Sequence, residues 1–134
     1  MQIRDSQMKV FQTEAERNFI ERVIQFLRER HPDTIEGLAE DVIRRRVAGA
    51  VLKAKSYGFT WESALVGFVA ILFALGPNFD QHPAFQSALS KTGNTDENER
   101  IRGIYRSVTN QEWEEAREFS DDSAWTAIEE QGMQ

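Results

Sequence analysis

The chain has 134 residues, of which 40% are apolar and 28% are charged, and it carries a net charge of −6. A chain of this length and apolar content can bury a core of its own, so we expect one folded domain and exclude a disordered polypeptide. It contains no cysteine, which excludes disulfides, thiol catalysis and thiolate metal sites and agrees with a cytoplasmic location. The first residues lack the apolar stretch of a secretory signal, so we expect none.

The first predicted helix runs from about Asp5 to Arg30. Its apolar residues are Met8, Phe11, Ala15, Phe19, Ile20, Val23, Phe26 and Leu27. Their spacing of three and four positions places them on one helical face. We expect Asp5 or Ser6 to cap the N-terminus of this helix. We expect Pro32 to end it, because a proline disfavours the α conformation of the preceding residue.

A second helix is predicted from Asp33 to about Tyr57. Asp33 and Glu36 have the spacing of a capping box, in which two side chains bind the free amides at a helix start. Gly37 is a candidate interruption of this first turn. Gly58 stands where a residue in the left-handed conformation commonly ends a helix.

Residues 64–75 form a run of twelve positions without one polar side chain. A helix that is apolar on all sides must be buried all round, either in lipid or inside a bundle. Twelve residues make about 18 Å of helix, well short of the ~30 Å hydrocarbon core of a membrane. We therefore predict no membrane insertion and a central helix over about 61–75, capped by Thr60 and ended by Gly76 and Pro77.

Shorter helices are expected after the central one. Pro83 suits the first turn of a helix over 83–91, for which Asp80 is a candidate cap. Asp96 and Glu99 repeat the capping-box spacing and predict that the next helix begins there. A break near residues 109–110 then separates it from a last helix.

The whole pattern predicts an all-α fold, because no stretch shows the alternation of a strand. We expect a compact bundle of five to six helices around the central apolar helix. Residues 1–110 form its core. Residues 111–134 form an acidic helical segment that packs on this same domain or extends from it.

The negative charge is concentrated near the C-terminus. Residues 111–134 carry eight acids and one base, whereas residues 1–110 carry fifteen bases and fourteen acids. Such a segment attracts basic partners and repels nucleic acid, although a merely solvated face is the commoner role. Trp113 and Trp125 lie in it, and tryptophan is enriched where binding energy concentrates. Anchoring of the segment to the core is the competing interpretation of both tryptophans.

No catalytic or metal-binding constellation is recognisable in the sequence. His31 and His82 each precede a proline and, with Asp33 and Asp80 nearby, match no common metal motif, so we expect them to mark helix boundaries. Phosphate-binding glycine patterns and nucleophile motifs do not occur. The three arginines at 44–46 fan out around a helix and do not converge on one phosphate. We expect no cofactor, no metal and no nucleic-acid partner.

Two short motifs flank the central helix. Residues 57–59 read Tyr-Gly-Phe, and residues 75–83 read Leu-Gly-Pro-Asn-Phe-Asp-Gln-His-Pro. With the opening Ile-Arg-Asp-Ser-Gln-Met at 3–8, their order resembles a group of small all-helical bacterial proteins encoded beside VgrG and PAAR spike proteins and effectors of type VI secretion systems. The likeness covers roughly residues 3–110. It departs at Phe85, because the group has a tryptophan soon after the proline.

This resemblance implies a non-enzymatic, cytoplasmic adaptor or chaperone that binds an effector or a VgrG/PAAR spike protein and aids its loading. The alternative is an immunity-type inhibitor that binds a basic toxin through the acidic C-terminal segment. A homodimer that shares the central helix is a further expectation. The residues expected to contact a partner are Trp113, Glu114, Glu118, Trp125, Phe79 and Asp80.

Overall fold

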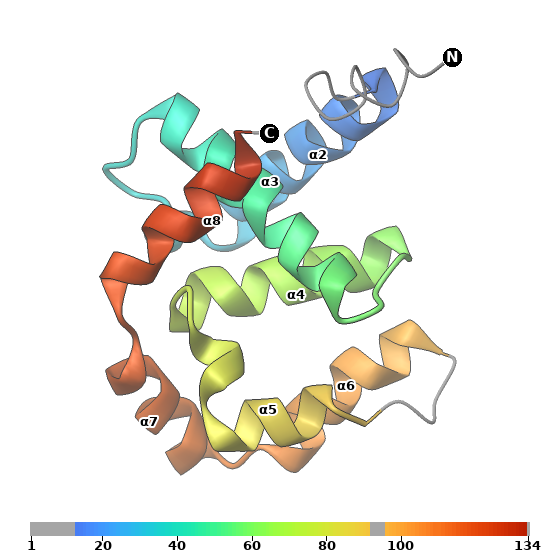
Figure 1. The fold of residues 1–134 in the computed structure, drawn as a ribbon, viewed down its shortest axis with the longest axis vertical. Helices are drawn as coiled ribbons and strands as arrows, with labels where there is room; N and C mark the ends of the chain where they lie inside the picture. The colour runs from blue at the N-terminus through green and yellow to red at the C-terminus, as the bar shows by residue number, and fades with distance from the viewer. Residues whose placement is uncertain (1–12, 92–95, 134) are drawn as a thin grey trace.

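A computed structural model describes residues 13–91 and 96–133, and within them it contains seven α-helices, three short 3-10 helices and no strand (Figure 1). The all-α prediction is confirmed. There are seven helices where five to six were expected, because the acidic C-terminal stretch is broken into two. The elements are α2 (Glu14–Arg30), η1 (Pro32–Thr34), α3 (Glu40–Ser56), α4 (Glu62–Leu75), η2 (Phe79–Gln81), α5 (Pro83–Leu89), α6 (Glu97–Ser107), α7 (Asn110–Phe119), η3 (Asp122–Ala124) and α8 (Trp125–Gly132).

The apolar helix α4 lies across the middle of the molecule, as predicted. In Figure 1, α2, α3 and α8 lie on one side of it, and α5, α6 and α7 lie on the other. Phe68 of α4 is fully buried, and its ring centroid lies 5.3 Å from that of Phe79 and 6.0 Å from that of Phe59. Ile71 and Phe73 are buried as well. The helix therefore finds its apolar surroundings within its own chain.

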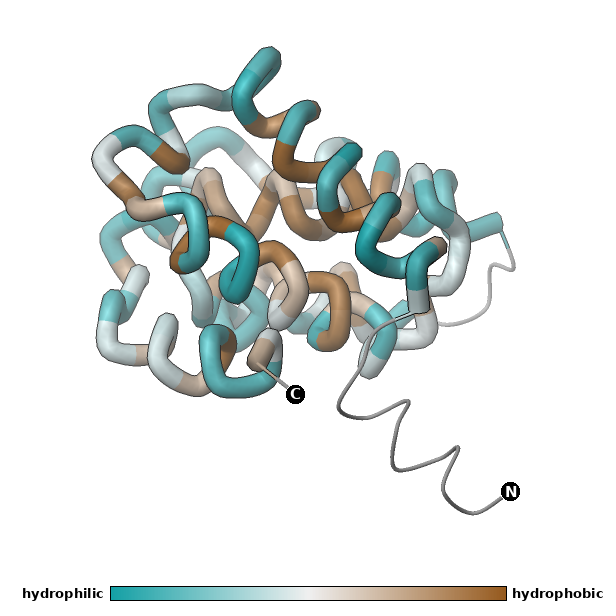
Figure 2. The backbone as a smooth tube through the Cα atoms, turned by 90° about the horizontal axis from the view of Figure 1, so that it is seen from above, coloured by the Kyte–Doolittle hydropathy of each residue, from teal (hydrophilic) through white to brown (hydrophobic). Residues whose placement is uncertain are grey.

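The distribution of hydropathy follows this arrangement. In Figure 2 the apolar turns face the middle of the molecule, and the outer turns of the helices are hydrophilic. None of the helices in the described ranges has both the length and the hydropathy needed to cross a membrane.

The first two helix starts differ from their predictions. The hydroxyl of Thr13 accepts a hydrogen bond from the amide of Glu16 and caps α2, whereas the predicted caps Asp5 and Ser6 lie outside the described residues. The second helix was predicted to begin at Asp33, which is wrong, because α3 begins at Glu40. Residues 32–34 form η1, and Gly37 then turns the chain with a φ of 81°, a conformation that no α-helix contains.

Several helix ends agree with the predictions. Gly58 and Gly76 follow α3 and α4 with φ values of 92° and 117°, and both helices end there. Pro83 occupies the first turn of α5. The predicted cap Asp80 is wrong, because the Nδ1 atom of His82 accepts the hydrogen bond from the amide of Ala84.

Candidate functional site

The two motifs that flank the central helix meet in space. The hydroxyl of Tyr57 donates a hydrogen bond of 2.6 Å to Oδ2 of Asp80, and Nζ of Lys53 lies 2.8 Å from Oδ1 of the same carboxylate. Lys53 also donates to the carbonyl of Pro77. Asp80 is only 5% exposed. A buried carboxylate is tolerated when it is paired and hydrogen-bonded, so these contacts fix the loop after α4 against the end of α3.

The same contacts perturb the Tyr57 phenol. Burial of the ring and then the hydrogen bond to the Asp80 carboxylate raise the pKa of Tyr57 far above its usual value. The phenol therefore stays protonated and acts as a hydrogen-bond donor. This geometry gives Tyr57 and Asp80 a structural role in joining two segments of the chain.

Helix α6 holds the turn between α3 and α4 from the other side. The carboxylate of Glu97 accepts three hydrogen bonds of 2.6 to 2.7 Å, from the amide and hydroxyl of Thr60 and from the amide of Trp61. Thr60 was predicted to cap α4, which is wrong. The Thr60 hydroxyl donates to Glu97 instead of accepting from an amide of α4. Glu97, 36 residues after Trp61 in the chain, accepts the hydrogen bonds from the amides at the helix start.

Arg100 lies one turn after Glu97 and binds the same turn. Its guanidinium donates to the carbonyls of Tyr57 and Leu89 and lies 4.2 Å from the centre of the Phe59 ring. This combines two hydrogen bonds with a cation–π contact. Neither of the roles of Glu97 and Arg100 was predicted from the sequence. Their only signal was a charged pair three residues apart on one face of a helix, which is common on exposed helices.

Phe79 begins a row of aromatic rings that reaches from the core to the surface. Its ring centroid is 5.5 Å from that of Phe85, which lies 5.0 Å from Trp113, which in turn lies 5.3 Å from Tyr105 and is stacked on it. Phe79 is fully buried and Trp113 is partly buried, whereas Tyr105 is 55% exposed. Edge and stacked contacts at these distances stabilise the junction of α5, α6 and α7.

Asn78 and Trp125 make two of the contacts that attach the C-terminal segment to the rest of the chain. The amide side chain of Asn78 donates to the carbonyl of Phe119 and accepts from the amide of Asp121, so it holds the end of α7. Trp125 of α8 is buried against Phe73, and the guanidinium of Arg46 lies 4.2 Å from the centre of its indole ring.

Helix α8 also approaches α3 closely. Glu129 pairs with Arg46 at 3.0 Å. Gly49 of α3 leaves room for the backbone of α8, because an added Cβ would overlap the carbonyl oxygen of Ile128. Helix α8 thus packs against α3 and contributes Trp125 and Ile128 to the core.

The six residues predicted to contact a partner lie in different environments. Phe79, Asp80 and Trp125 are buried, so in this conformation they offer no surface to a partner. Glu114 and Glu118 are exposed on α7, where Glu114 also pairs with Arg117. The two histidines lie at helix boundaries, as predicted, with His31 after α2 and His82 before α5. Residues 13–91 and 96–133 contain no group of three or more His, Cys, Asp or Glu side chains arranged to hold a metal ion.

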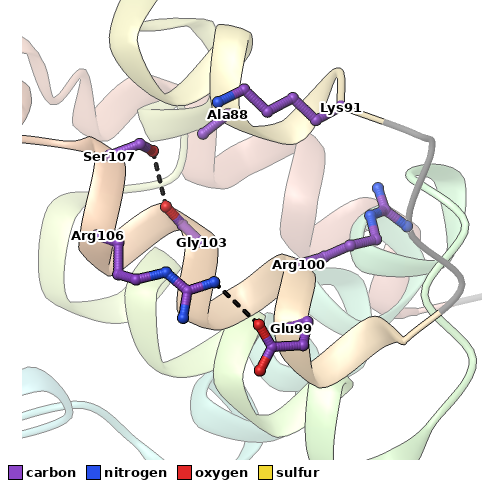
Figure 3. A pocket seen from close by; sticks show the side chains of 7 residues that line it. All are labelled: Ala88, Lys91, Glu99, Arg100, Gly103, Arg106 and Ser107. Carbon is purple, nitrogen blue, oxygen red and sulfur yellow. Dashed lines mark hydrogen bonds and ion pairs between the residues drawn. The ribbon is translucent and has the colours of Figure 1, made fainter.

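The surface carries two notable hollows. One, of about 200 Å³, is largely apolar and lies between α2, α3 and α4, where Phe19, Leu52 and Leu65 contribute to it. The other, of about 330 Å³, lies between α5 and α6 and is lined by small and charged residues (Figure 3).

Comparison with protein-family models, with curated proteins and with solved structures gave no match to this chain.

Proposed function

We propose that this protein is a non-enzymatic, cytoplasmic adaptor or chaperone that binds an effector or a VgrG/PAAR spike protein of a type VI secretion system and aids its loading. The observation that carries the proposal is the meeting of the two motifs on which the resemblance rests. Tyr57 of the first and Asp80 of the second share a hydrogen bond in a buried cluster. The motif residues thus serve to shape the molecule, which suits a protein that acts through its surface.

The proposal is tested by co-purification. The tagged chain is expressed with the effector and spike proteins encoded beside its gene, and retained proteins are identified by mass spectrometry. We expect one of these proteins to be retained and its secretion to fall when the gene is deleted. Retention of none of them, together with unchanged secretion of the effector in the deletion strain, would refute the adaptor role.

The exposure of Glu114 and Glu118 on α7 favours the second candidate, an immunity-type inhibitor of a basic toxin. Deletion of residues 111–134 is a poor test, because it removes the buried residues Ala116, Trp125 and Ile128 from the core. A double substitution, Glu114→Lys with Glu118→Lys, reverses the surface charge and leaves the core intact. Protection of cells from a co-expressed toxin should then be lost; protection equal to that of the wild type would exclude this face.

A further inference from the structure

A groove between α5 and α6 is lined by small and charged side chains. It encloses about 330 Å³ and is lined by Ala88, Lys91, Glu99, Arg100, Gly103, Arg106 and Ser107. Figure 3 shows the Lys91 side chain running back along α5 over Ala88, with Gly103 and Ser107 of α6 facing it. A second hollow shares Ala88, Lys91 and Ser107 and continues the groove along α5 toward Glu112.

Gly103 has no packing reason to be glycine. It lies inside α6, where glycine costs about 1 kcal/mol relative to alanine. An added Cβ at Gly49, Gly67 or Gly132 would press on a neighbouring helix, which explains those glycines. At Gly103 an added Cβ would lie more than 4 Å from every neighbouring heavy atom of the described residues. The effect of the glycine is therefore to leave the floor of the groove open.

The groove is basic although the chain as a whole is acidic. Its lining has two cations that are open to a ligand, Lys91 and Arg106, and one acid, Glu99, whereas the chain has a net charge of −6. The guanidinium of the third lining cation, Arg100, is already bound to two backbone carbonyls. Lys91 is exposed and makes no ion pair with any residue in the described ranges. Arg106 is 64% exposed at its side chain and pairs with Glu99 at 2.9 Å. Such an exposed pair contributes little stability, so its arginine is available to another anion.

The dimensions of the groove fit a short stretch of polypeptide. The seven residues of α5 extend for about 10 Å, which corresponds to about three residues of an extended chain. A backbone can approach closely over a glycine, and the adjoining Ala84 and Ala88 offer small apolar contacts. A nucleic acid is disfavoured, because the lining of the groove, among the residues that the structure describes, includes no aromatic ring on which a base could stack.

We propose that this groove binds an extended acidic segment of a partner protein, with a carboxylate held by Lys91 and Arg106 and the backbone of the segment lying over Gly103. The inference rests on the proposed adaptor function and assigns it a surface. It also assigns the partner a chemistry, namely an Asp or Glu side chain in an extended segment of about three residues.

The test uses the full chain and a random dodecapeptide phage library. Peptides selected on the wild-type protein are synthesised with a fluorescent label, and their binding is measured by fluorescence polarisation. We expect the selected peptides to be acidic and to bind Gly103→Leu and Lys91→Glu at least ten-fold more weakly than the wild type. The matched controls are Thr126→Leu and Lys55→Glu, which introduce the same residues at exposed positions of other helices and should leave binding unchanged.

Circular dichroism checks that each variant is folded, and Gly103→Ala provides a smaller change at the same position if Gly103→Leu is not. The inference is overturned if no acidic peptide is enriched, or if the enriched peptides bind Gly103→Leu as well as they bind the wild type. It is also overturned if a single-stranded oligonucleotide or inorganic phosphate binds in the groove where acidic peptides do not. If a protein encoded beside the gene is retained equally by the wild type and by Gly103→Leu, the groove is not its binding site, but the adaptor function still holds. If the wild type retains none of these proteins, the adaptor function itself is refuted.

Discussion

Glu97 offers the sharpest test of how this fold is held together. The substitution Glu97→Ala removes an acceptor of three hydrogen bonds at the start of the central helix. A net hydrogen bond to a charged group contributes about 1.5 to 3 kcal/mol, but Thr60 and Trp61 lie at an exposed turn where water replaces part of each. We therefore expect a loss of about 2 to 3 kcal/mol in the free energy of unfolding. Glu97→Gln keeps one acceptor oxygen and should lose about 1 kcal/mol.

Urea unfolding followed by circular dichroism measures both values. The control is Glu118→Ala, which removes an exposed acid that has no ion pair within the described part of the chain. It should change the stability by less than about 0.5 kcal/mol. If Glu97→Ala unfolds at the same urea concentration as this control, then Glu97 does not secure the helix start and the reasoning fails.

The pH dependence of the stability provides a second test of the Glu97 carboxylate. Burial alone would raise the pKa of Glu97, but the hydrogen bonds from Trp61 and Thr60 outweigh it and lower that pKa below its usual value. A lowered pKa in the folded state means that the carboxylate stabilises the protein above the unfolded-state pKa. This contribution is lost as the pH falls through the folded-state pKa. The stability difference between wild type and Glu97→Gln should therefore be full at pH 7 and shrink below about pH 4.5.

Three further predictions concern the packing of the helices. Gly49→Ala should destabilise the protein by about 2 kcal/mol, because the new methyl group displaces α8. Gly103→Ala has open space around it and should stabilise the protein by about 0.5 to 1 kcal/mol. Thermal unfolding measures both, and a change of the melting temperature in the same direction for the two variants would contradict this. Asn78→Ala should lower the free energy of unfolding by about 2 kcal/mol, since it removes two hydrogen bonds to the backbone of the C-terminal segment. The near-UV circular dichroism of the tryptophans should fall as the packing of that segment loosens. Tyr57→Phe should cost about 1 to 2 kcal/mol in urea unfolding by depriving Asp80 of a donor, and an unchanged midpoint would show that this bond contributes nothing.

The fold class was predictable from the sequence because its signals are local. The apolar run at 64–75 and the spacing of apolar residues before it depend only on neighbouring positions, and the structure confirms what they predict. The prolines and the glycines at 58 and 76 likewise mark helix ends by their own backbone preferences. The start of α3 was misplaced because Asp33 and Glu36 have the sequence spacing of a capping box. The backbone turns at Gly37 instead.

The candidate site was predictable only in part, because its contacts join residues far apart in the chain. The motifs at 57–59 and 75–83 were singled out as segments, but the hydrogen bond between Tyr57 and Asp80 spans 23 positions. Single-sequence patterns carry no information on such pairs. The same limit concealed the roles of Glu97 and Arg100, which are indistinguishable in the sequence from the charges on any exposed helix. The groove was equally hidden, since its lining combines residues of α5 and α6 that come together only in space.

The long reach of Glu97 also has a consequence for synthesis on the ribosome. At 5 to 20 residues per second, about 2 to 7 s pass between translation of Trp61 and translation of Glu97. In the later part of that interval, after Leu75 has been translated, the apolar segment is complete while Glu97 is still untranslated. The amides at the start of α4 therefore gain this acceptor only after Glu97 has been translated, so α4 cannot be secured by residues that precede it in the chain alone.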